Sequence, residues 1–169
     1  MPDSSSSTLR PAVPDDLHAL AAIDARCFPR GIAYPAEEIA ALLQARSALT
    51  LIAERAAVIV GFASMRLLRR SPLLPRRGEL VTIDVIPEFR RAGLGGELHR
   101  ALEDWLAAVG GTSIELHVSV SNTEAIDFYQ RLDYSVIARV PLYYLETIDA
   151  WKMEKLLSPR GATSKFIDE

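Results

Sequence analysis

The chain has 169 residues, of which 49% are hydrophobic and 24% are charged, a composition typical of one folded domain. Its 19 basic and 22 acidic residues give a net charge of −3, which excludes a broadly basic surface for nucleic acid. Cys27 is the only cysteine, so the sequence also excludes an internal disulfide framework and a cysteine-rich zinc site.

The sequence has no apolar run long enough to cross a bilayer, because the longest one covers only residues 56–65. The N-terminus is acidic and polar, without the basic and apolar segments of a secretory signal. We therefore expect a cytoplasmic protein with no membrane partner. We also expect a disordered tail at 1–7, a single domain over 8–157 and a flexible C-terminal tail at 158–169.

Strand-like and helix-like patterns alternate along the first half of the chain. They predict a strand at 8–13, a helix at 14–27 and a second helix at about 35–45. Two further strands, 49–54 and 58–68, flank a tight turn and predict a hairpin.

The second half continues the alternation. The patterns predict a loop (71–78), a strand (79–86), a helix (93–109), a strand (112–121), a helix (about 122–132) and two strands (134–140 and 151–157) around a loop with Pro141, Tyr143 and Tyr144. The order β-α-α-β-β-β-α-β-α-β-β indicates one α/β domain with a mixed sheet and helices on both faces.

The turn between the strand at 79–86 and the following helix carries the most specific signal. It contains Arg90 and Arg91, followed by Gly93, Gly95 and Gly96. Glycines let the backbone approach a ligand, a helix start offers unpaired N–H groups, and arginines add charge-assisted donors. The turn therefore predicts a phosphate or pyrophosphate ligand, with a plain strand-to-helix turn as the alternative.

This turn matches neither of two common nucleotide motifs. A P-loop is excluded because no Gly-Lys-Ser/Thr follows, and the dinucleotide fingerprint lacks its third glycine because position 98 is leucine. Seven arginines stand against three acidic residues between positions 66 and 91, which favours a local anion site. The arginines at 66–77 are more simply interpreted as a solvated loop.

The pattern Arg90-x-x-Gly93-x-Gly95, between a strand and a long helix, resembles the acyl-CoA pyrophosphate loop of the GNAT superfamily of N-acetyltransferases. The segment 116–132, with its asparagine, Ala-Ile and tyrosine, resembles a later motif of that family. The resemblance extends over about residues 8–157. It implies a single-domain GNAT-like fold with a mostly antiparallel twisted sheet, and it implies acetyl-CoA as the cofactor.

The resemblance is closest to the branch that acetylates protein N-termini, including the ribosomal-protein type. Four local similarities support this branch: Phe28-Pro29, Tyr34, Leu116-His117-Val118 and the Tyr143-Tyr144 pair. The sequence departs from the family at Leu132-Asp133-Tyr134, where Leu-Gly-Phe is usual. Aspartate tolerates a turn conformation better than most residues, so we expect the turn to survive.

The resemblance implies two alternative positions for a general base. Glu79 falls where several family members keep a catalytic glutamate, and His117 falls where N-terminal acetyltransferases place a histidine or glutamate. Glu115, on the same strand face as His117, could orient it or relay a proton, although a solvated position is the simpler interpretation. Tyr129 would be the general acid beside the thioester sulfur; alternatively it packs in the core with Phe128.

The cofactor contacts implied by the resemblance lie on the central strand, the glycine-rich loop and the later motif. They are Ile83, Val85, Arg90, Arg91, Ala92, Gly93, Leu94, Gly95, Gly96, Asn122 and Tyr129. Asn122 could instead serve only as a helix cap. The family stabilises the oxyanion with a backbone N–H of the central strand, here near Val85 or Ile86.

The implied acceptor groove would be lined by Phe28, Tyr34, Tyr143 and Tyr144, for which simple packing is an equal alternative. Cys27 is interpreted as a small buried hydrophobe. His18 and His99 are interpreted as solvent-facing helix residues, and no metal site is expected.

The leading functional hypothesis is transfer of an acetyl group from acetyl-CoA to the α-amino group of a protein or peptide N-terminus. One alternative acceptor is a small amine, such as an amino acid, a polyamine or a drug. Another alternative is a non-catalytic acyl-CoA-binding module. A peptide acceptor predicts an open groove between the first interhelical loop and the loop with Tyr143, whereas a small amine predicts a closed pocket. We expect a monomer or homodimer with no nucleic-acid partner.

Overall fold

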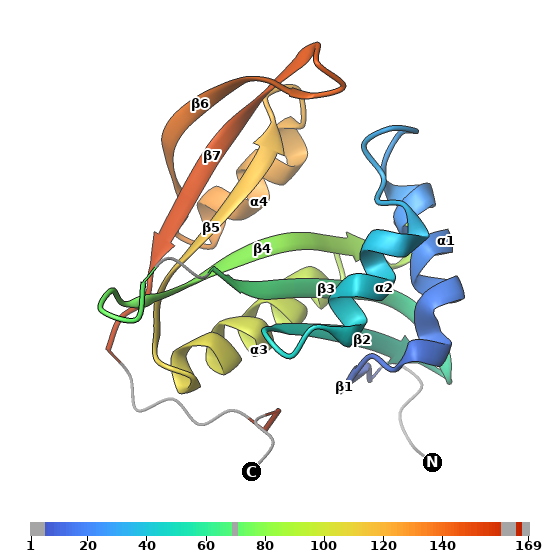
Figure 1. Ribbon diagram of the computed structural model, residues 1–169. Coiled ribbons are helices and arrows are strands. Elements are labelled where there is room, and N and C mark those ends of the chain that lie inside the picture. Colours follow the sequence, from blue (N-terminus) through green and yellow to red (C-terminus); the bar gives the residue numbers. More distant parts are fainter. Residues whose placement is uncertain (1–5, 69–70, 160–164, 167–169) are drawn as a thin grey trace.

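One seven-stranded sheet runs through the molecule in the order β1-β2-β3-β4-β5-β7-β6 (Figure 1). The computed structural model describes residues 6–68, 71–159 and 165–166. The strands are β1 (Thr8–Pro11), β2 (Ala48–Arg55), β3 (Val58–Leu68), β4 (Arg76–Val85), β5 (Gly111–Ser119), β6 (Ser135–Tyr144) and β7 (Ile148–Leu156). The helices are α1 (Leu17–Cys27), α2 (Ala36–Gln44), α3 (Leu94–Ala108) and α4 (Thr123–Arg131), with short 3-10 turns η1 (Pro14–Asp16) and η2 (Pro87–Phe89).

The predicted element order is confirmed, and every strand pair is antiparallel except β4 with β5. Most of the predicted tails, residues 1–5, 160–164 and 167–169, lie outside the described residues, so the tails stay a prediction. Within the described part of the chain, no helix is long and apolar enough to cross a membrane.

Two hydrophobic clusters cover the two faces of the sheet. On one face, Leu20 and Ile23 of α1 and Ile39 of α2 pack with Ile52 and Phe62. On the other face, the leucine stripe of α3 packs with alternate residues of β2, β3 and β5, and α4 joins the same cluster through partly buried residues. Because side chains alternate along a strand, β2 and β3 supply both clusters, and helices cover both faces of the sheet as predicted.

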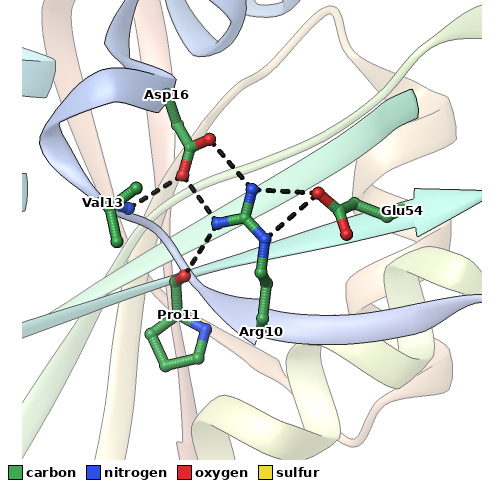
Figure 2. A network of polar contacts seen from close by, with 5 residues as sticks. All are labelled: Arg10, Pro11, Val13, Asp16 and Glu54. Carbon is green, nitrogen blue, oxygen red and sulfur yellow. Dashed lines mark hydrogen bonds and ion pairs between the residues drawn. The ribbon is translucent and has the colours of Figure 1, made fainter. Parts of the chain in front are cut away.

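A polar network fastens the beginning of the chain to the sheet. Figure 2 shows Arg10 of β1 between two carboxylates: its Nη1 donates to Asp16 Oδ2 at 2.8 Å and its Nη2 to Glu54 Oε1 at 2.9 Å. Asp16 Oδ2 also accepts from the N–H of Val13 at 2.8 Å. The hydrogen bond from Arg10 lowers the pKa of Asp16, so this carboxylate is ionised at neutral pH and holds the start of α1 against β1 and β2.

The sheet splits into two halves between β4 and β5. These parallel strands pair only from Arg76 opposite Gly111 to Glu79 opposite Glu115. Beyond that point β4 remains paired with β3 as far as Val85, while β5 remains paired with β7. The ends of the two strands therefore diverge, and Figure 1 shows this fork with β5, β6 and β7 turning away from β4.

The structure corrects the predicted bounds of two elements. The strand predicted at 79–86 begins at Arg76, so the loop predicted at 71–78 is too long, because pairing with both β3 and β5 outweighs the weak strand propensity of Arg-Arg-Gly. The loop predicted around Pro141, Tyr143 and Tyr144 is also wrong, because β6 runs to Tyr144. β6 is an edge strand paired only with β7, where proline is tolerated.

His99 is buried, 1% exposed, and not solvent-facing as predicted. It lies on the broad apolar side of α3, and its Nε2 is 2.8 Å from the hydroxyl of Tyr134. Burial lowers the pKa of His99 to about 4, so the ring is neutral at neutral pH. The histidine is therefore a hydrogen-bonded core residue that joins α3 to the end of α4.

Substituting Tyr134→Phe should lower the free energy of unfolding by roughly 1–3 kcal/mol, because it leaves the buried His99 Nε2 without its partner. Urea denaturation measures this change. Tyr143→Phe is the control, since Tyr143 is 44% exposed and its hydroxyl can bond to water. An equal effect of both substitutions would show that the buried hydrogen bond contributes nothing specific.

Candidate active site

The fork between β4 and β5 opens into a cleft of about 1090 Å³. Its walls come from the end of α1 and the loop after it, from β4, from the loop before α3, and from β5, α4 and the end of β6. Most of the sequence-predicted site residues line it: Phe28, Tyr34, Ile83, Val85, Arg90, Arg91, Gly93, Leu94, Gly95, Gly96, His117, Asn122, Tyr129 and Tyr144. Glu79, Ala92 and Tyr143 do not.

The glycine-rich loop leaves its backbone open toward the cleft. Gly93 has a φ of +83°, and a Cβ added at Gly93 or Gly96 would meet no atom within 4 Å. Arg90 Nε donates to the carbonyl oxygen of Val85 at 2.8 Å, which fastens the loop to the end of β4. Since the first N–H groups of α3 have no partner within the helix, this end of the cleft is suited to an anion.

Gly95 has a different role from its neighbours. A Cβ there would lie 3.2 Å from the ring of Phe128, so the glycine lets α4 approach the start of α3. Asn122 caps α4, because its Oδ1 accepts from the N–H of Ala125 at 3.2 Å. Asn122 also lines the cleft, so the predicted cap is present and a ligand contact remains open to it.

Tyr129 projects from α4 among aromatic neighbours. Its ring lies 5.4 Å from that of Phe128 and 5.6 Å from that of Tyr134, in edge-to-face contacts. Burial of the hydroxyl raises the pKa of Tyr129 above its ordinary value near 10. The hydroxyl therefore keeps its proton at neutral pH and can donate it.

His117 is held at the cleft by two tyrosines from β6. Its ring stacks on Tyr143 with centroids 4.4 Å apart and planes 8° apart, and the hydroxyl of Tyr144 donates to its carbonyl oxygen at 3.2 Å. Partial burial lowers the pKa of His117, outweighing the opposing effect of Glu79 and Glu115. The buried Nδ1 has no hydrogen-bond partner among the described residues, so no side chain described there fixes the tautomer of the ring.

The two glutamates predicted near His117 both form ion pairs with arginine or lysine. Glu79 Oε2 accepts from Arg66 Nε at 2.5 Å and does not line the cleft. Glu115 is 5% exposed and forms ion pairs with Arg77 at 3.0 Å and Lys152 at 3.2 Å. The solvated position predicted for Glu115 is therefore wrong. His117 is better placed than Glu79 to act as a base in the cleft.

One of the two predicted oxyanion donors is already used. The N–H of Ile86 donates to the carbonyl oxygen of Val60 at 3.0 Å. Successive residues of a strand turn their N–H groups to opposite sides, so the N–H of Val85 points away from β3 and toward the fork. Val85 is the remaining candidate.

The end of the cleft that was predicted to hold the acceptor is formed by the loop after α1 and the end of β6. Tyr34 is fixed there, because its hydroxyl donates to the carbonyl oxygen of Val81 at 3.3 Å. Gly31 has a φ of +89°, and a Cβ at this position would lie 2.4 Å from the side chain of Leu145. The loop after α1 therefore touches the turn after β6, and the predicted open groove is bridged at this point.

Three cleft features were missed at the sequence level. Cys27 is half-buried and lines the cleft with its thiol 3.6 Å from the carbonyl oxygen of Val85, so its interpretation as a buried hydrophobe is only partly right. Thr82 lines the cleft and donates to Asp84 at 2.7 Å. Asp84 and Asp24 are buried acids from β4 and α1 that lie beneath the cleft and do not line it, and no pattern in their segments distinguished them from exposed acids.

Comparison with known proteins gives a consistent result. The model of the acetyltransferase (GNAT) family matches residues 17–134. N-alpha-acetyltransferase 20 of Dictyostelium discoideum is 40% identical over 91 residues, 53% of this chain, and the chain spans 52% of that relative's length. An N-alpha-acetyltransferase of Saccharolobus solfataricus is 28% identical over 157 residues, which cover 89% of this chain and 93% of that protein.

Solved structures share the fold. The ribosomal-protein-S18-alanine N-acetyltransferase from Escherichia coli superimposes with a TM-score of 0.79 at 24% identity, covering 95% of this chain and 100% of that one. Arabidopsis thaliana NAA60 in complex with acetyl-CoA gives a TM-score of 0.80 at 19% identity, covering 90% and 99%. At these identities the likeness shows the predicted fold.

Substituting Gly93→Ala should weaken binding of coenzyme A, the ligand predicted for this loop, by about tenfold or more, because a left-handed φ strains alanine where the backbone must meet the phosphates. Isothermal titration calorimetry measures the affinity. Gly110→Ala is a matched control at the other end of α3: its φ is +84° and its Cβ would also meet nothing within 4 Å. Equal loss of affinity in both variants would contradict a direct role for the loop.

Proposed function

The chain belongs to the acetyltransferase (GNAT) family, and from this we propose that it transfers an acetyl group from acetyl-CoA directly to the α-amino group of a protein or peptide N-terminus. The observation that supports the proposal is the forked cleft, whose lining includes the glycine-rich start of α3, Tyr34 and Tyr144, and both His117 and Tyr129. The names of the relatives, which are N-alpha-acetyltransferases, support this choice of acceptor.

The residues at the anion end fit the phosphates of coenzyme A. Gly93 and Gly96 leave space for a pyrophosphate beside the helix N–H groups, and Arg91 adds a cation to the lining. Acetyl-CoA would supply an activated acyl group as a thioester. The N–H of Val85 would stabilise the negative charge that develops on the carbonyl oxygen.

His117 is proposed as the general base. An α-amine has a pKa of roughly 7.7–8.0, so it needs only a modest base to reach its neutral, nucleophilic form. Neutral His117, stacked on Tyr143 and held in place by it, lines the cleft and can accept that proton on its imidazole ring. Glu79, paired with Arg66, would act on His117 through its charge and not as the base itself.

Tyr129 is proposed as the general acid. Because burial keeps its hydroxyl protonated, the side chain can donate a proton to the departing thiolate. Asn122, Ile83 and the other cleft-lining residues are proposed cofactor contacts. Phe28, Tyr34 and Tyr144 are proposed acceptor contacts, and Tyr143 contributes by orienting His117.

A small amine is a second candidate acceptor, and the contact between Gly31 and Leu145 favours it. That contact encloses the acceptor end, as expected for a pocket that holds a small molecule. A non-catalytic acyl-CoA-binding module has no need for a neutral histidine and a protonated tyrosine in the same cleft. The cytoplasmic location and the monomeric or homodimeric state stay predictions.

Release of free thiol from acetyl-CoA should require peptides with a free N-terminus. The panel contains Met-initiated and ribosomal-protein-like peptides, the same peptides blocked at the N-terminus but carrying lysine, and small amines. Turnover with small amines alone would assign the second candidate. Binding of acetyl-CoA without turnover of any acceptor would contradict the proposed activity.

A control substitution separates enzymatic transfer from background hydrolysis. Tyr129→Phe should lower kcat by roughly 100-fold or more while leaving the affinity for acetyl-CoA nearly unchanged, because only proton donation is lost. Equal kcat in both proteins would remove Tyr129 from the mechanism.

The pH dependence of kcat at saturating acceptor should show an acidic limb with its midpoint below 6.5, because the pKa of His117 is lowered and only the neutral ring acts as a base. His117→Gln should abolish this limb. Tyr143→Ala should move the midpoint upward, because water then reaches the imidazole. His18→Gln, on the exposed side of α1, is the control and should leave the profile unchanged. A limb that persists in His117→Gln would assign the base elsewhere.

A further inference from the structure

Two buried carboxyl groups meet beneath the cleft. Asp24 of α1 is 0% exposed and Asp84 of β4 is 1% exposed. Asp24 Oδ2 accepts from the backbone N–H of Tyr34 at 2.6 Å, and Asp84 Oδ1 accepts from the hydroxyl of Thr82 at 2.7 Å. The second oxygen of each group is buried and receives no donor from the described residues. Asp84 is the register partner of Phe62, which packs with Leu20 and Ile23 of α1, so its side chain lies on the sheet face that carries Asp24. Each carboxyl group also shifts the pKa of the other.

From this geometry we propose that Asp24 and Asp84 share one proton, and that the pair positions the acceptor loop after α1 against the reactive end of β4. Two ionised carboxylates in contact inside a protein repel each other strongly. A single bound proton converts that repulsion into a hydrogen bond and satisfies both remaining oxygens. Burial raises the pKa of both groups, so the pair retains a proton that an exposed aspartate would lose.

The surrounding groups do not neutralise a second charge. Cys27 of α1 and Tyr129 of α4 face the pair, and each has a raised pKa to which Asp84 contributes. Arg90 is the cation that acts on Asp84, but its Nε is bonded to the carbonyl oxygen of Val85. The shared proton is therefore the simplest way to hold both acids in the core.

The Asp24–Asp84 pair links the proposed acceptor end of the cleft to the strand proposed to bind the thioester. Asp24 holds the N–H of Tyr34, an acceptor-side residue, while Asp84 directly precedes Val85, the candidate oxyanion donor. Loss of the shared proton places two negative charges between α1 and β4. The acceptor loop would then move away from the strand that binds the thioester, so acceptor binding would weaken as pH rises.

The proton shared by Asp24 and Asp84 can be tested without measuring enzymatic activity. Carboxyl resonances of 13C-labelled aspartate at neutral pH should show one protonated aspartate, and this signal should vanish in Asp84→Asn. The free energy of unfolding of the native sequence should fall relative to Asp84→Asn as pH rises above about 4, because the folded state retains a proton that the unfolded chain has lost. Fully ionised aspartates at neutral pH, or parallel stability curves, would overturn the shared proton.

Asp16→Asn is a matched control of opposite sign. Arg10 lowers the pKa of Asp16, so its stabilising contribution is present above about pH 4 and is lost as pH falls through the folded pKa. This variant should be less stable than the native sequence at neutral pH, with a difference that shrinks in acid. Asp84→Asn should instead gain stability relative to the native sequence as pH rises.

The positioning role is tested at Tyr34. Exchange of its amide hydrogen should be about tenfold faster in Asp84→Ala, and within about threefold of the native rate in Asp84→Asn, whose amide still donates to Asp24. If the proposed transfer reaction is confirmed, the acceptor KM should follow the same order while the KM for acetyl-CoA stays constant. Unchanged exchange at Tyr34 in Asp84→Ala would overturn the positioning role, whether or not any acceptor is turned over.

Discussion

The fork in the sheet begins at two glutamates that face each other at the last paired position of β4 and β5. Glu79 and Glu115 are register partners, and like charges directly opposite each other destabilise a strand pair. Each carboxylate is balanced by neighbouring cations: Glu79 by Arg66 of β3, and Glu115 by Arg77 of β4 and Lys152 of β7. These ion pairs lie at the point at which the strands separate.

Both branches of the sheet line the cleft just beyond this fork. His117 is two residues past Glu115 on one branch, and Val81 is two residues past Glu79 on the other, so the cleft begins where the ladder ends. Strand alternation keeps His117 on the same face as Glu115. The same geometry frees the N–H groups of β4 that a continuous parallel ladder would have used. A closed sheet with this sequence would have neither a cleft nor an unpaired donor at Val85.

The sequence was most informative where local chemistry decides the structure. The glycine-rich turn, the element order and the helix cap at Asn122 depend on neighbouring residues and were predicted. The burial of His99, Glu115 and Asp84 depends on partners distant in the chain, namely Tyr134, Arg77 with Lys152, and Asp24. A polar residue on a strand or helix face has the same local signature whether it meets water or a buried partner, so periodicity alone could not distinguish them.

At the proposed acceptor end of the cleft, the turn after β6 has a strained backbone and also packs on the loop after α1. Leu145 and Glu146 form the turn after β6 with φ values of +54° and +55°, and the N–H of Thr147 closes it onto the carbonyl oxygen of Tyr144 at 3.1 Å. Each left-handed residue that is not glycine costs roughly 1–2 kcal/mol.

The packing of Leu145 on Gly31 offsets part of this cost, and Gly31 suits the contact because it has a positive φ and no Cβ. The two halves of the sheet are thus joined at the base by the β4–β5 ladder and at the rim by this contact. An acceptor that reaches His117 from the rim must pass beneath the contact or open it. A slender, extended chain end or a small amine can pass beneath the contact, whereas a folded protein surface cannot.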